Sequence, residues 1–93
     1  MYDDNLPPEA IKKYIERRKK DLIDCQKAVE EKDFQKISGI AHQVKGNAAS
    51  FGFDSLGQLA IELEKSALSQ DILKTTYLVN LFAEAVASLT EVI

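Results

Sequence analysis

The sequence is poor in the side chains that hold metals: its 93 residues include one histidine, His42, and one cysteine, Cys25. A zinc site needs more such ligands, and carboxylate-bridged sites in helical bundles need Glu-x-x-His pairs that one histidine cannot supply. A single cysteine cannot form a disulfide within the chain, so nothing requires an oxidising compartment. We therefore expect no metal, no cofactor and a location in the cytoplasm.

Glycine and long apolar runs are also scarce. The four glycines form no glycine-rich phosphate loop, so ATP binding is not expected. The apolar runs are short, which indicates neither a signal peptide nor a membrane-spanning helix. We therefore expect no contact between this domain and a membrane.

Positive charge is in the minority, with 12 basic against 15 acidic residues and a net charge of -3. This balance argues against nucleic acid as a partner, and no DNA-binding module is recognisable. The basic residues are nevertheless concentrated in one segment: Lys12, Lys13, Arg17, Arg18, Lys19 and Lys20. A solvated helix face is the simpler interpretation of this segment, and steering of an acidic partner is the alternative.

Apolar residues recur at steps of three and four along the chain, which predicts amphipathic helices. We expect helices over residues 7–31, 34–51, 54 or 55 to 68, and 72–93, and no strand. Short turns make neighbouring helices antiparallel, so the predicted fold is all-α, an antiparallel up-down-up-down four-helix bundle. The length fits one domain over residues 1–93, either free-standing or part of a longer chain.

Local signals refine the helix ends. Asp33 is expected to cap the second helix, and Gly52 is expected to end it in the left-handed conformation. A Ser-x-x-Gln sequence starting at Ser55 fits a capping box for the third helix, with Asp54 as the alternative cap. Ser69 is expected to cap the fourth helix.

The apolar stripes also predict the core. Cys25 falls on the stripe of the first helix and is expected to be a small core residue. Arg18 interrupts that stripe and is expected to extend along its aliphatic stem to water. Thr76 is placed on the inner face of the last helix. A second apolar row on that helix is attributed to burial: Leu78, Leu81 and Ala85.

His42 has unusual neighbours. It lies one residue past Ala41 of the apolar stripe, about 100° round the helix, so we expect it on the shoulder of the buried face or in solvent. Residues three and four apart meet on a helix surface. For His42 these neighbours are Ser38, Gly39, Lys45 and Gly46.

A glycine inside a helix costs about 1 kcal/mol of helix stability relative to alanine. Two glycines beside the only histidine therefore depart from the composition that favours a helix, and such departures are expected at functional sites. The glycines are there either for close helix packing or for a function of His42, and we favour function. An unprotonated imidazole is a nucleophile near neutral pH. A phosphoryl group transferred to it would bring negative charge, which Lys45 would offset, while the glycines would make room for the donor. A Ser-His-Asp hydrolase is left open, although a small bundle offers little concavity for a substrate.

The sequence His42-x-x-Lys45-Gly46, followed by Phe51-Gly52 and Leu56, resembles the signature of histidine-containing phosphotransfer (HPt) domains. The resemblance covers residues 34 to about 68, and the outer helices match only in length and pattern. It implies a four-helix bundle that relays phosphoryl groups between aspartates of response-regulator receiver domains.

The resemblance also implies roles for individual residues. His42 would accept the phosphoryl group, Lys45 would be its charge partner and Gly46 would clear access to the ring. Glu64 stands where some family members have a glutamine that bonds the non-reacting ring nitrogen, so it is a candidate for orienting the ring. Surface residues that could contribute to receiver docking are Gly39 and Gln43.

The implied partners are response-regulator receiver domains, with magnesium held by the receiver, and a hybrid sensor histidine kinase as a candidate parent chain. We expect a monomeric phosphocarrier without its own nucleotide site, rather than an enzyme. Two alternatives stay open: an adaptor of the same fold that binds a receiver or kinase without being phosphorylated, and a structural bundle whose histidine is incidental.

Overall fold

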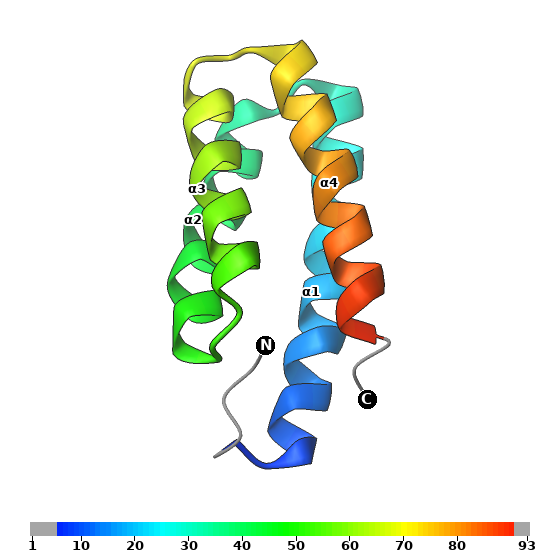
Figure 1. The fold of residues 1–93 in the computed structure, drawn as a ribbon. Coiled ribbons are helices and arrows are strands. Elements are labelled where there is room, and N and C mark those ends of the chain that lie inside the picture. The colour runs from blue at the N-terminus through cyan, green and yellow to red at the C-terminus, as the bar shows by residue number, and fades with distance from the viewer. Residues whose placement is uncertain (1–5, 91–93) are drawn as a thin grey trace.

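The computed structural model describes residues 6–90, which form four helices packed side by side (Figure 1). Their bounds are α1 Pro8–Glu31, α2 Phe34–Ser50, α3 Asp54–Leu68 and α4 Ile72–Thr90. Each helix packs against two neighbours, in the order α1–α2–α3–α4 and back to α1, and the α2–α3 contact is the most extensive. The predicted all-α, antiparallel up-down-up-down bundle is confirmed, and residues 6–90 contain no strand.

The ends of α1 and α2 follow from local chemistry. Pro8 lies in the first turn of α1, where its missing N–H costs nothing. The carboxylate of Asp33 accepts a hydrogen bond from the Lys36 backbone N–H at 3.1 Å, which confirms it as the cap of α2. Gly52 has a φ of 79°, and the Phe53 N–H donates to the Ala48 carbonyl at 2.9 Å. The predicted left-handed turn after α2 is therefore confirmed.

Two predicted caps are wrong. The N-cap position of α3 is held by Phe53, without a side-chain cap, so Ser55 lies inside the first turn and cannot form a capping box. Phe53 is 5% exposed, and its burial after the Gly52 turn sets where α3 begins. Ser69 ends α3, and the α4 cap is Asp71, whose carboxylate accepts from the Lys74 N–H at 3.1 Å.

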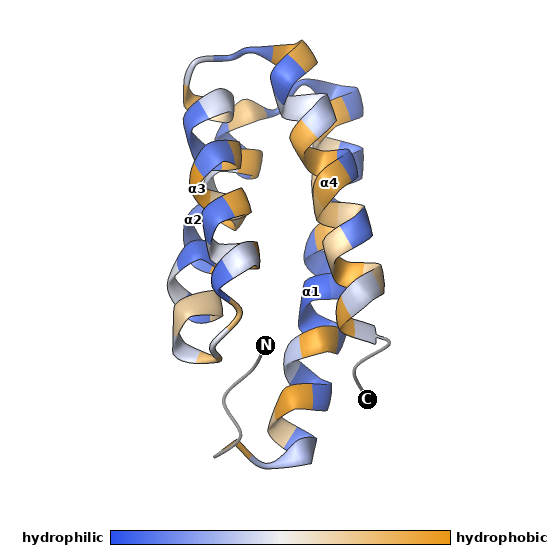
Figure 2. Ribbon diagram, viewed as in Figure 1, coloured by the Kyte–Doolittle hydropathy of each residue, from blue (hydrophilic) through white to orange (hydrophobic). Residues whose placement is uncertain are grey.

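The core is one apolar cluster to which all four helices contribute. Cys25 is fully buried, as predicted. Hydrophobic residues recur along α4 (Figure 2), and those buried in the core are Leu78, Val79, Phe82, Val86 and Leu89. By length and composition, α4 could also cross a membrane, with a mean hydropathy of 1.2. One such helix is weak evidence of a membrane span, and 33% of this stretch is buried inside the bundle.

Two polar residues differ from the sequence prediction. Arg18 is only 5% exposed: its Nε donates to Asp21 at 2.7 Å and its guanidinium lies 4.6 Å from the centre of the Tyr14 ring. A carboxylate and an aromatic face together offset the loss of water around the cation, so Arg18 does not extend into solvent. Thr75, rather than Thr76, is fully buried. Its hydroxyl can be buried because it donates a hydrogen bond to the Ser66 hydroxyl at 3.0 Å.

Candidate functional site

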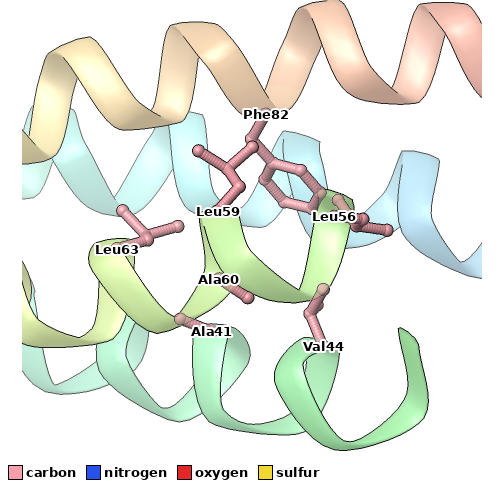
Figure 3. A pocket seen from close by; sticks show the side chains of 7 residues that line it. All are labelled: Ala41, Val44, Leu56, Leu59, Ala60, Leu63 and Phe82. Carbon is pink, nitrogen blue, oxygen red and sulfur yellow. The ribbon is translucent and has the colours of Figure 1, made fainter. Parts of the chain in front are cut away.

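His42 projects from the outer side of α2, next to the buried Ala41. Its side chain is 67% exposed, which agrees with the predicted place on the shoulder of the buried face. Behind it, Ala41 and Val44 pack against α3 and α4. Figure 3 shows this part of the core, where the Phe82 ring points from α4 toward Leu56 and Leu59 of α3.

A carboxylate from α3 joins two of the predicted site residues. Oε2 of Glu64 lies 2.9 Å from Nδ1 of His42, and Oε1 of the same carboxylate accepts a hydrogen bond from Lys45 Nζ at 2.9 Å. The Glu64 side chain is 19% exposed, whereas Lys45 is 36% exposed. The three side chains therefore form a cluster that ties α2 to α3, which we call the His42 cluster.

The charge of Glu64 decides which ring nitrogen is available. The hydrogen bond from Lys45 holds the pKa of the Glu64 carboxyl below its ordinary value against an opposing effect of burial, and His42 adds to the lowering. The carboxyl is thus ionised at neutral pH and can only accept hydrogen bonds. Nδ1 of His42 must then carry the hydrogen and donate it to Glu64, which leaves the lone pair of the neutral ring on Nε2. Among residues 6–90, no group forms a hydrogen bond with Nε2.

The glycines beside His42 have no packing role. A Cβ added at Gly39 or Gly46 would meet nothing within 4 Å, and both residues are exposed. Close packing between α2 and α3 occurs at Gly57 instead, where a Cβ would lie 3.7 Å from that of Ala48. The packing interpretation of the glycines next to His42 is therefore wrong, and the surface around the ring is open.

The remaining candidates lie around this open surface. Gln43 is exposed on the side of α2 that faces α1, where it lines a groove between the two helices together with Asn47. Asn47 was not singled out from the sequence, although it lies one turn after Gln43 on the same face. Ser38 is turned toward its own helix, since its hydroxyl donates to the Gln35 carbonyl at 2.9 Å.

The core behind His42 has no room for a substrate. The void behind α2 in Figure 3 is apolar and has a volume of only about 10 Å³, too small for a substrate. Within residues 6–90 no group of three or more His, Cys, Asp or Glu side chains could hold a metal ion. The arrangement thus presents an exposed imidazole ring held by Glu64, with Lys45 on the same carboxylate.

Comparison with known proteins gives one match. No curated protein and no solved structure matches the chain. The family model described as Hpt domain matches residues 9–91, which include all four helices of the bundle. Histidine phosphotransfer in phosphorelays, through contact with response-regulator receiver domains, is the general role of that family. On its sequence match and its four-helix fold, the chain belongs to the Hpt domain family.

Proposed function

We propose that this chain is a phosphorelay carrier that takes a phosphoryl group from a receiver-domain aspartate onto Nε2 of His42 and passes it to another receiver. The observation that carries the proposal is the state of the ring. The only histidine in the chain is exposed, its Nδ1 is hydrogen-bonded to Glu64, and no group of residues 6–90 bonds Nε2. The general role of the family is histidine phosphotransfer, and His42 is the only histidine of the sequence that could accept the phosphoryl group.

The transfer step follows from this geometry. The lone pair of Nε2 attacks the phosphorus of the aspartyl phosphate, the P–O bond breaks and the aspartate leaves as a carboxylate. The imidazole becomes cationic and keeps its Nδ1 hydrogen, which is donated to the Glu64 carboxylate at 2.9 Å. That carboxylate offsets the new positive charge on the ring, while Lys45 provides the cation nearest to the incoming phosphoryl oxygens. Transfer to the second aspartate is the reverse of these events.

The surroundings of the ring fit a docking site for another protein. Gly39 and Gly46 leave open space on both sides of His42 along α2, and Gln43 is exposed beside it. We assign Gly46 to access and Gly39 and Gln43 to contact with the receiver. Magnesium, where the reaction uses it, would be held by the receiver. We also propose that the carrier acts as a monomer in the cytoplasm, without nucleotide, and that a hybrid sensor histidine kinase is one source of phosphoryl groups.

The test is phosphate incorporation from isolated receiver domains that have been phosphorylated with labelled acetyl phosphate and magnesium. The wild type should acquire an acid-labile, base-stable label, and His42→Gln should acquire none while keeping its helical circular dichroism. Label on the variant would overturn the assignment, since the sequence has no second histidine. Receivers that bind both proteins without labelling either would favour the adaptor, and absence of both binding and label would favour a structural bundle.

A further inference from the structure

The basic segment of the sequence forms one wall of a groove beside the His42 cluster. The groove lies between α1 and α2, and four exposed cations of α1 line it: Lys12, Lys13, Arg17 and Lys20. Arg18 also lines it but is neutralised by Asp21 at 2.7 Å. Two acids, Glu9 and Glu16, are in the same wall, and Glu16 is 3.7 Å from Lys19. The groove is therefore net positive on a chain with a net charge of -3, and we call it the α1 basic groove.

The pairing of α1 and α2 brings the end of the groove that holds Arg17 and Lys20 toward the level of His42. The Tyr14 hydroxyl donates to Asn47 Oδ1 at 2.9 Å, which aligns the two antiparallel helices at that point. Measured from that contact, His42 lies five residues toward the N-terminus of α2, or about 8 Å. Lys20 lies six residues toward the C-terminus of α1, or about 9 Å, and because the helices are antiparallel this is the same direction. Gln43, the residue next to His42, lines the groove. A partner that covers His42 therefore also meets the groove.

The chemistry of the transfer identifies the charge of that partner. A donor of phosphoryl groups to His42 presents an aspartyl phosphate, and a pocket that holds magnesium beside it is built from further carboxylates. The rim of this pocket is therefore acidic. Cations on the surface beside the acceptor nitrogen face the approaching receiver and favour the encounter, whereas cations behind the nitrogen would not face it. The floor of the groove is apolar and includes Ala10 and Phe51, which provides surface for a protein contact.

From these observations we infer that the α1 basic groove is a second contact surface for the receiver domain, which attracts the acidic rim of its phosphorylation pocket and sets the rate of encounter with His42. The inference rests on the proposed function and adds to it a surface on α1 that the His42 motif does not include. Nucleic acid is the competing polyanion, but the two acids in the wall and the negative net charge of the chain disfavour it.

The test compares two variants of equal charge. Lys13→Gln with Lys20→Gln removes two cations from the groove, and Lys27→Gln with Lys36→Gln removes two exposed cations that do not line it. Transfer from receivers phosphorylated with acetyl phosphate is followed by rapid quench, over a range of receiver concentrations and at low and high salt. The groove variant should lower the second-order rate constant about fivefold at low salt, with the difference lost at high salt. Its rate at saturating receiver should equal that of the wild type.

Each result has a defined meaning. Equal second-order rate constants for the groove and control variants would overturn the groove inference while leaving the carrier function intact. A slower rate at saturating receiver would also overturn it, because the cations would then act in the transfer step rather than in the encounter. Duplex DNA that binds the wild type but not the groove variant, with transfer unchanged, would assign the groove to nucleic acid. No labelling of the wild type by any receiver would instead defeat the proposed function.

Discussion

Oε2 of Glu64 lies 2.9 Å from Nδ1 of His42, across the contact between α3 and α2. The two residues are 22 positions apart in the chain, so only the packing of the two helices brings them together. The second oxygen of the same carboxylate accepts a hydrogen bond from Lys45, so one side chain of α3 contacts both His42 and Lys45 of α2. Five predictions follow from the bundle and from this cluster.

The first prediction concerns the tautomer of His42. In Glu64→Ala the ring loses its acceptor, so the hydrogen should no longer be confined to Nδ1. Glu64→Gln should keep the hydrogen there, because the amide oxygen can accept the same bond. The ¹⁵N chemical shifts of the imidazole measure the tautomer directly. Glu62→Ala is the control, since Glu62 is on the same helix and faces Lys74 at 4.0 Å. An unchanged tautomer in Glu64→Ala would show that the carboxylate does not position the ring.

The second prediction concerns the pH dependence of the free energy of unfolding. Glu64 has a lowered pKa in the folded protein, so its ionised form stabilises the fold above the ordinary value of 4.5, and this contribution is lost as the pH falls through the lowered value. The difference in free energy of unfolding between the wild type and Glu64→Gln should therefore be largest near neutral pH and fade in acid. Urea unfolding at a series of pH values measures it, with Glu62→Gln as the control. A difference that persists undiminished in strong acid would contradict the prediction.

The third prediction separates stability from access at Gly46. A side chain there meets open space, so Gly46→Ala should raise the free energy of unfolding by up to about 1 kcal/mol through helix propensity. Gly46→Gln should fold equally well yet accept phosphoryl groups at least about tenfold more slowly, because a donor held off by about 1 Å loses the reacting geometry. Ala87→Gln places the same side chain on an exposed position of α4 and serves as the control. Unimpaired transfer in Gly46→Gln would show that the glycine does not provide access.

The fourth prediction concerns Cys25. Burial, with smaller effects of Asp21 and Asp24, raises the pKa of its thiol to about 12, and the residue is 0% exposed. Because the thiolate is the reactive form, the native protein should resist Ellman's reagent and iodoacetamide at pH values near 8. Labelling should become rapid in denaturing urea, so its rate should report unfolding. Rapid labelling of the native protein would mean that the core around α1 opens without global unfolding.

The fifth prediction concerns the core behind the site. Phe82 is 2% exposed and packs against the residues of α2 and α3 that support the His42 cluster (Figure 3). Phe82→Ala should lower the free energy of unfolding by about 3 kcal/mol or more. Tyr77→Ala, at a residue that is 61% exposed on the same helix, should change it by less than about 0.5 kcal/mol. Chemical denaturation measures both variants, and equal losses would contradict the assignment of Phe82 to the core.

Much of the fold could be predicted from local patterns. Apolar spacing of three and four residues predicted the helices, and the short turns between them predicted antiparallel neighbours. Asp33 and Gly52 were assigned correctly because a capping carboxylate and a left-handed glycine act within one turn of the chain. The exposure of His42 followed from its angle to the apolar stripe.

The errors lie at polar residues, where individual contacts rather than periodicity decide the outcome. Arg18 was expected in solvent because the apolar stripe does not reveal that Tyr14, four residues before it, and Asp21, three residues after it, hold its guanidinium. Ser55 carries a capping pattern, but the N-cap of α3 is Phe53, so the helix starts two residues too early for Ser55 to cap it. Polar residues are placed by the partners that their side chains find, whereas apolar stripes are placed by periodicity.

The sequence by itself determined the helices, their antiparallel order and the position of the one imidazole ring. A family resemblance pointed to Glu64, but the local pattern could not reveal that its two oxygens are shared between His42 and Lys45. Only the packing of α3 against α2 decided that, because hydrogen bonds require distances near 3 Å that no spacing along separate helices specifies. The same holds for the α1 basic groove: the charges are visible in the sequence, but the Tyr14–Asn47 contact sets the register that brings Arg17 and Lys20 toward the level of His42.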